Sequence, residues 1–192
     1  MLILASCNSK TESNSETEAA DSIATEQVAE TVHTQQSASI YGSDDLKKFG
    51  LKGQVTTVTV KYDNDWIPGL VDDNLQFDAQ GKLISKLPDL KLTVNADGFI
   101  SKVVDDMGAS DGSETVADYT LNENGWPVKL KLQMSSPDAE AYADCTLTYP
   151  DVDEHGNWTK CVIKGSLVNI EEETGNEFEE PVNATITRVI TY

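Results

Sequence analysis

The side chains that could do chemistry in this chain are few, and their spacing does not match the common catalytic motifs. Of the two histidines, His33 lies in a polar stretch, and His155 lies in a segment typical of an exposed turn. At such a turn nothing would keep water away from a Ser-His-Asp triad. The sequence contains no Gly-x-Ser-x-Gly, His-Glu-x-x-His or phosphate-loop motif. We therefore expect no catalytic residues and no enzymatic activity.

Acidic side chains offer the alternative chemistry. Neighbouring carboxylates occur in the pairs Asp72–Asp73 and Asp105–Asp106 and in the run Glu171–Glu173, and a carboxylate pair can hydrolyse a glycosidic bond. Adjacent acids are more typical of solvated loops, so a carboxylate-dependent polysaccharide hydrolase is the alternative function here. The stretch 151–156 begins like a calcium loop, but Val162 stands at the twelfth position, where such a loop needs a bidentate Glu. We expect no metal site and no cofactor.

Two cysteines flank one predicted turn and are candidates for a disulfide. Three extra residues around Pro150–Asp151 would bring Cys145 opposite Cys161 on the neighbouring strand. Directly opposed residues lie roughly 4.5–5.5 Å apart, which is compatible with a disulfide. The alternative is a pair of small buried apolar side chains.

Three tryptophans are the candidate binding residues. Trp126 and Trp158 each follow shortly after a turn glycine, and Trp66 lies in a longer connection. Aromatic rings at hairpin ends usually cover the core of a sheet. The alternative is an exposed stacking surface for a sugar, a peptide or a protein, where binding energy concentrates.

A turn that recurs four times must position these side chains. The segments 78–81, 95–98, 122–125 and 153–156 each begin with Asp or Asn, end with Gly and follow a branched or aromatic residue. Asp or Asn favours the first position of a type I turn, and Gly tolerates the positive φ that often follows. Each segment therefore predicts the tip of a β-hairpin.

These turns also carry a resemblance to known proteins. Residues 77–83, Phe-Asp-Ala-Gln-Gly-Lys-Leu, resemble the unit of YD-type (Rhs-like) repeats, and the other three copies are more degenerate. The opening 51–58 and the closing 187–192 are similar to the ends of small Bacteroidetes-type hairpin-repeat lipoproteins. The resemblance covers about residues 45–192. It implies a hairpin-repeat architecture and no particular ligand.

Residues 44–192 are predicted to form a single all-β domain. Val128, Leu130 and Leu132 alternate with Lys129 and Lys131, a pattern typical of a strand with one buried face. Successive hairpins give an antiparallel meander, which could be a single twisted sheet, a sandwich or an open barrel. We expect a strand at 158–163, followed by a last hairpin of 167–170 and 184–192 around the acidic stretch 171–180. One helical turn is expected at 43–50, where Ser or Asp can cap the start and Gly can end it.

The N-terminal region predicts a lipid anchor and a tether. Leu4-Ala5-Ser6-Cys7 resembles a bacterial lipobox, in which Cys7 would become the lipidated N-terminus. We interpret residues 1–6 as a partial lipoprotein signal peptide, because no basic residue precedes Cys7. Residues 7–43 are rich in Ser, Thr, Glu and Gln, so we expect a disordered acidic tether.

The net charge of the chain limits the classes of partner that it can bind. The chain has 33 acids against 14 Lys and Arg, a formal charge of −19. A nucleic-acid reader needs a basic footprint, so we expect no nucleic acid. We expect a lipid-anchored envelope protein of the outer membrane, periplasmic or surface-facing, that acts as a binding or structural module for an envelope protein or glycan. An accessory subunit of an outer-membrane assembly is a further alternative.

Overall fold

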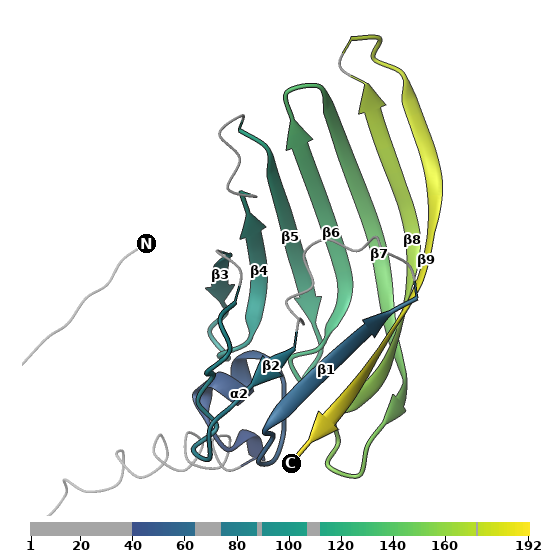
Figure 1. Cartoon of the computed structure of the whole chain (residues 1–192). Coiled ribbons are helices and arrows are strands. Elements are labelled where there is room, and N and C mark those ends of the chain that lie inside the picture. The colour runs from purple at the N-terminus through teal and green to yellow at the C-terminus, as the bar shows by residue number, and fades with distance from the viewer. Residues whose placement is uncertain (1–39, 64–73, 88–89, 107–111, 172) are drawn as a thin grey trace, which may run out of the picture.

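The structure, a computed structural model, describes residues 40–63, 74–87, 90–106, 112–171 and 173–192 (Figure 1). Within these residues lie the short helix α2 (Asp44–Lys48) and nine strands. The strands are β1 (Thr57–Tyr62), β2 (Leu75–Gln76), β3 (Lys91–Val94), β4 (Ile100–Asp105), β5 (Glu114–Leu121), β6 (Pro127–Ser136), β7 (Ala139–Val152), β8 (Trp158–Glu171) and β9 (Glu177–Thr191). No described helix has the length and apolar character needed to cross a membrane.

The described strands form one antiparallel sheet in the order β2-β1-β9-β8-β7-β6-β5-β4-β3. From β3 to β9 the spatial order follows the chain, so this part is a meander of hairpins. Strand β1 pairs with β9, from Thr57 opposite Thr191 to Tyr62 opposite Ile186. The short strand β2 lies beside β1 at the edge of the sheet. The all-β prediction is confirmed, and of the three arrangements left open the protein adopts the single sheet, which is curled (Figure 1).

All four predicted turns are present and share one set of hydrogen bonds. In each turn the glycine N–H donates to the carbonyl of the first residue, as Gly125 does to Asn122 at 3.0 Å. The side-chain oxygen of that first residue also accepts two backbone N–H bonds, as Asn122 Oδ1 does from Asn124 and Trp126. The glycine has a φ of +74° to +90° in all four turns. Local side-chain chemistry therefore determines these hairpin tips.

The two faces of the sheet differ as the alternation predicts. On β6, Leu130 and Leu132 are buried while Lys129 and Lys131 are exposed. On β7, Ala143 and Cys145 are buried, and the residues between them are exposed. We call the side that carries Leu130 the inner face and the side that carries Lys129 the outer face. The main hydrophobic core lies on the inner face.

A close approach of β7 and β8 coincides with a glycine, Gly165. Gly165 lies opposite Cys145, and a Cβ built on Gly165 would lie 2.1 Å from the carbonyl oxygen of Asp144. No side chain fits at that distance, so the two strands can approach there only because residue 165 is glycine. A glycine at such a position is one way in which a sheet bends.

Of the two interpretations of Cys145 and Cys161, the structure shows the pair of small buried side chains and not the disulfide. Both cysteines are free and buried, and Cys161 lies opposite Ile186 of β9. The ladder shifts between Thr148 and Asp151, as expected near Pro150, but it shifts back before Val152. The irregularity therefore moves no other pair out of register, and Cys145 lies opposite residue 165 rather than 161.

The last hairpin is also longer than the sequence indicated. We expected separate strands before and after residue 165 and an acidic loop over 171–180. Instead β8 runs without a break to Glu171, and a short turn closes with the Glu171 N–H bonded to the Asn176 carbonyl at 3.1 Å. The prediction placed the acidic residues 177–180 in a loop, but they begin β9.

Candidate functional site

The four turns meet one continuous stretch, residues 40–55, which we call the cap segment. It contacts them in chain order. Ser43 Oγ donates to the Gly81 carbonyl at 2.6 Å in the first turn, and the Lys47 ammonium lies 5.5 Å from the Phe99 ring, next to the second. Lys52 Nζ donates to Asn124 Oδ1 at 2.8 Å in the third turn. Its backbone N–H reaches Asn157, directly after the fourth, at 2.8 Å. The cap segment therefore closes this end of the sheet.

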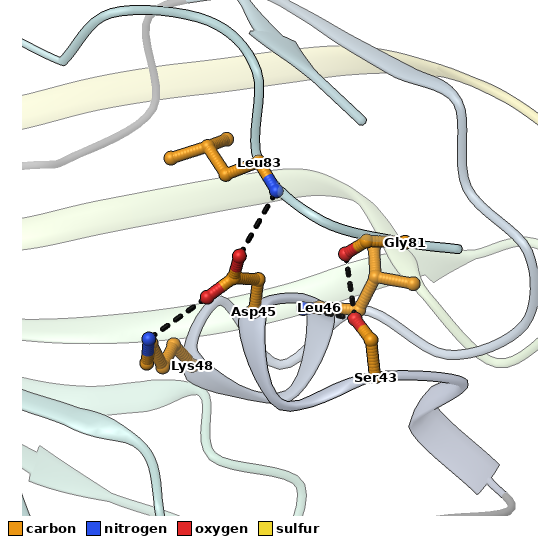
Figure 2. Close-up of polar contacts among 6 residues, drawn as sticks. All are labelled: Ser43, Asp45, Leu46, Lys48, Gly81 and Leu83. Carbon is orange, nitrogen blue, oxygen red and sulfur yellow. Dashed lines mark hydrogen bonds and ion pairs between the residues drawn. The ribbon is translucent and has the colours of Figure 1, made fainter. Parts of the chain in front are cut away.

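Helix α2 is held against the first turn by its own capping residues. Figure 2 shows Ser43 Oγ accepting the Leu46 N–H at 3.0 Å, which caps the helix, while the same hydroxyl donates to Gly81. Asp45 accepts from the Leu83 N–H at 3.0 Å and from Lys48 Nζ at 2.8 Å (Figure 2). The hydrogen bond from Lys48 has the largest effect on the pKa of Asp45 and holds that pKa below its usual value.

Asn157 joins three distant parts of the chain at the fourth turn. Its side-chain oxygen accepts from the Lys52 N–H, and its amide nitrogen donates to the Lys52 carbonyl and to the Tyr192 hydroxyl, each at 2.9 Å. Tyr192 donates in turn to Asp153, and its ring stacks on His155 with centroids 3.7 Å apart. This polar cluster is satisfied internally, so we assign it a structural role.

The two ionisable groups of this cluster shift in opposite directions. Burial and the hydrogen bond to the Asp153 carboxylate raise the pKa of Tyr192 to about 12. Burial alone would raise the pKa of Asp153, but hydrogen bonds from Tyr192, Asn157 and His155 outweigh it and leave that pKa below its usual value. Both shifts favour a neutral phenol that donates to a charged carboxylate.

A row of aromatic rings crosses the inner face beneath the cap segment. Trp126 and Tyr149 have ring centroids 5.2 Å apart, and Tyr149 and Trp158 have centroids 5.4 Å apart. A cation lies at each end: the Arg188 guanidinium is 3.6 Å from the Trp158 ring, and Lys52 Nζ is 5.7 Å from the Trp126 ring. We call these five residues the aromatic row. Such cation–π contacts are favourable, most of all where water is excluded.

Hydrogen bonds fix the members of the aromatic row. Trp126 Nε1 donates to the Gly50 carbonyl at 3.2 Å, Tyr149 Oη donates to the Pro127 carbonyl, and Arg188 Nε donates to the Trp158 carbonyl at 2.6 Å. The polar edge of each of these side chains is therefore held by backbone. Its flat or apolar part is left to line the inner face.

Four members of the aromatic row, all except Lys52, line a small cavity of about 60 Å³. Its walls also include Lys48 and Phe49 from the cap segment and apolar side chains from several strands, among them Ile100, Leu147, Cys161 and Ile186. The lining of the cavity includes two cationic side chains, Arg188 and Lys48, together with aromatic and aliphatic side chains. It is suited to a small ligand with an apolar body.

A second depression opens between β4 and β5. Their pairing stops at Lys102 opposite Asp118, while Tyr119 and Thr120 remain paired with β6. The strands separate from there toward the turns (Figure 1). The resulting open groove of about 900 Å³ is lined by Tyr41, Lys47, Asn95, Ala96, Asp97, Phe99, Ser101, Tyr119, Thr120, Leu121, Asn122 and Glu123. Its lining mixes charged, amide and aromatic groups without the close convergence seen in the cavity.

Of the two interpretations of the tryptophans, the structure shows the first for Trp126 and Trp158, rings that cover the core. Trp126 and Trp158 are 7% and 5% exposed and belong to the hydrophobic core, so they cannot form an open stacking surface. They instead share the wall of the cavity. Trp66 and Cys7 lie outside the described residues.

Among the described residues, the acidic groups that were candidates for hydrolysis do not come together in one site. Asp105 and Asp106 lie at the end of β4, where Asp106 pairs with Lys91 at 3.3 Å, and Glu171 lies at the end of β8. Three strands separate β4 from β8 in the sheet. Asp72–Asp73 lie outside the described residues. Within the part of the chain that is described, no cluster of three or more His, Cys, Asp and Glu side chains could hold a metal ion.

Sequence reasoning missed Arg188 and Tyr149. Arg188 is 4% exposed and continues the inward-facing series Val182, Ala184 and Ile186 on β9. A cation at an inward position of an alternating strand was the available signal, because buried arginine is rare unless its charge is compensated. Comparison of the chain with protein families, curated proteins and solved structures found no match.

Proposed function

We propose that the protein is a lipid-anchored binding module of the cell envelope, in which the cavity beneath the cap segment takes a small ligand. The observation that carries this proposal is the aromatic row, whose rings and Arg188 line a cavity next to the cap segment. Ligand sites are typically concave and largely apolar, with a few fixed polar groups. The cavity has this composition on a small scale.

The charge around the cavity favours an acidic group on the ligand. Arg188 is held by its bond to the Trp158 carbonyl, and Lys48 comes from the cap segment on another side of the cavity. Lys48 is shared with Asp45, which weakens its own pull on an anion. We therefore propose a carboxylate with a short aliphatic chain, oriented mainly by Arg188, because a cavity of about 60 Å³ is too small for an aromatic ring.

The anchor belongs to the same proposal. Cys7 in its lipobox-like context would be lipidated, and residues 8–39 would link it to the cap segment, which begins at Ile40. Two or more acyl chains are enough for stable membrane attachment, since each buried CH₂ contributes about 0.8 kcal/mol. The tether would then join the domain at the end where the cavity lies.

Two measurements test the two halves of this proposal. The intact mass of the protein from its native membrane should correspond to cleavage before Cys7 plus the mass of acyl chains. An unprocessed chain without lipid would remove the envelope assignment and leave the cavity untouched.

Ligand binding is tested with propionate, a carboxylate small enough for the cavity, and a matched pair of variants. Tyr149→Leu removes the central ring of the aromatic row, whereas Tyr142→Leu makes the same change on the outer face. Because Trp126 and Trp158 line the cavity, we expect propionate to change tryptophan fluorescence saturably in the native protein and in Tyr142→Leu and more weakly in Tyr149→Leu, with all three folded by near-ultraviolet circular dichroism. Equal binding by both variants would exclude the cavity.

A further inference from the structure

The outer face carries a concentration of lysines that the strongly acidic composition conceals. Lys129, Lys131 and Lys164 are exposed near the middle of the sheet on β6 and β8. None of the three forms an ion pair with another described residue. The chain as a whole has a formal charge of −19, so a group of cations on one face is a local reversal of sign.

The strand register arranges two of these lysines in a row of polar side chains. Thr120 lies opposite Lys129, Lys129 opposite Thr146, Thr146 opposite Lys164, and Lys164 opposite Asn183. All five side chains are exposed. We call them the outer row. Neighbouring strands are about 4.8 Å apart, so the outer row crosses five strands over roughly 19 Å and its two ammonium groups are about 10 Å apart.

The outer row contains no acid. Acids on the outer face lie farther along the strands, at Glu140 and Glu177, and also in the parallel row beside the outer row. There Asp118, Lys131 and Asp144 lie opposite one another across β5, β6 and β7, and Asp118 also pairs with Lys102 at 3.3 Å. Lys131 therefore adds a cation next to the outer row, with carboxylates on both sides. Lys129 and Lys164, in contrast, have no acid directly opposite them on either neighbouring strand.

We propose that the outer row binds an acidic polysaccharide. Hydroxyl, ammonium and amide groups alternate along it, which suits a chain in which sugar hydroxyls alternate with carboxylates. The spacing of the two ammonium groups is close to the length of a disaccharide, so the matching polymer carries one acid per disaccharide. The assignment rests on the proposed envelope location, where such polymers occur, and it adds a second surface to the cavity.

Two other polyanions fit the outer row less well. An anionic bilayer would meet the whole outer face, including Asp118, Asp144 and the acids that begin β9 at 177–180. Nucleic acid has a denser and more continuous charge than two lysines can match, and its binding needs a broad basic footprint. A single polysaccharide chain can follow the outer row and leave the neighbouring acids in water.

The test measures binding of the full 192-residue chain to soluble polymers by affinity electrophoresis. Hyaluronan, with one carboxylate per disaccharide, is the main probe. Polygalacturonate has a denser charge, and dextran is neutral. We expect retardation by hyaluronan, weaker or equal retardation by polygalacturonate and none by dextran, with retardation declining as salt is raised.

Matched triple variants identify the surface. Lys129→Gln, Lys131→Gln and Lys164→Gln together should weaken hyaluronan binding about tenfold or more, since three exposed charge contacts are lost. The control combines Lys82→Gln, Lys86→Gln and Lys91→Gln and alters net charge equally. These three lysines are exposed and lie away from the outer row, two of them after β2 and one on β3, the two edge strands of the sheet. It should leave binding within about twofold of the native protein.

Several outcomes would overturn the proposal. No retardation by either acidic polymer would remove the outer row as a polysaccharide site, and equal loss in both triple variants would show attraction without a defined surface. Stronger binding to DNA or to phosphatidylglycerol vesicles than to hyaluronan would assign the lysines to another polyanion. None of these results depends on whether Cys7 is lipidated, so the anchor and the outer row fail separately.

Discussion

Gly125, the last residue of the third turn, occupies a position that requires glycine for two separate reasons. Its φ is +74°, a region in which other L-residues are strained. A Cβ at this position would also lie 2.1 Å from Phe99 Cδ1. The third turn therefore packs directly on the aromatic residue that follows the second turn, and the glycine at position 125 serves this packing as well as the turn itself.

Replacing Gly125 with Ala should separate these two effects when it is compared with Gly175→Ala. Gly175 has a similar φ of +66°, but no atom lies within 4 Å of its Cβ position. Gly175→Ala should cost about 1–2 kcal/mol of unfolding free energy from the backbone alone. Gly125→Ala should cost roughly 1–3 kcal/mol more, because the Phe99 ring must move. Urea denaturation of both variants measures the difference, and equal losses would mean that Phe99 relaxes freely.

Among the elements, α2 is stabilised more by what it contacts than by its own length. Five residues are too few for a helix to persist in isolation. Ser43 caps it, and the same hydroxyl bonds to the first turn, while Asp45 bonds to Leu83. The helix and the first turn therefore depend on each other.

Ser43→Ala should accordingly weaken the whole cap segment. The change removes a helix cap and a hydrogen bond to Gly81, so we expect a loss of about 1–2 kcal/mol in unfolding free energy. Ser166→Ala is the control, because Ser166 lies mid-strand on β8 and makes no side-chain hydrogen bond with a described residue. Thermal denaturation of the two variants gives the comparison. If Ser43→Ala and Ser166→Ala have the same melting temperature, the hydrogen bonds of Ser43 do not contribute to stability.

The elements also show what could be predicted from sequence. The four turns were predictable because their Asp, Asn and Gly residues form bonds within a few positions. The faces of β6 followed from alternation. The Cys145–Cys161 pairing was left open because it required the sign and extent of a bulge, which depend on packing across strands. The aromatic row was not predictable, because Trp126, Tyr149 and Trp158 meet only after β5 to β8 have assembled.

At the scale of the whole molecule, the cavity requires a curled sheet, because residues from distant strands line it. Ile100 of β4 and Ile186 of β9 both line it. Five strand spacings separate β4 from β9, which would be about 24 Å in a flat sheet. A cavity of 60 Å³ cannot span that distance, so the inner face must curve around it. The cap segment then closes one end, and the fold needs no second sheet to enclose its core.

The contact that joins the last strand to the cap segment should make stability depend on alkaline pH. The pKa of Tyr192 is raised to about 12 by burial and by its bond to Asp153, against about 10 in the unfolded chain. Between pH 10 and 12 the folded protein therefore keeps a proton that the unfolded chain has lost. Its stabilising contribution is complete below pH 10 and is lost as the pH rises toward 12.

Tyr192→Phe should flatten this dependence and expose what the cluster contributes at neutral pH. Without the phenol, Asn157 and Asp153 each lose a partner, so unfolding free energy at pH 7 should fall by roughly 1 kcal/mol. The further decline between pH 10 and 12 should be smaller than in the native protein. Denaturant titrations at several pH values measure both. Parallel curves would show that Tyr192 ionises alike in both states, and the join between β9, the fourth turn and the cap segment would then rest on Asn157 and Lys52 alone.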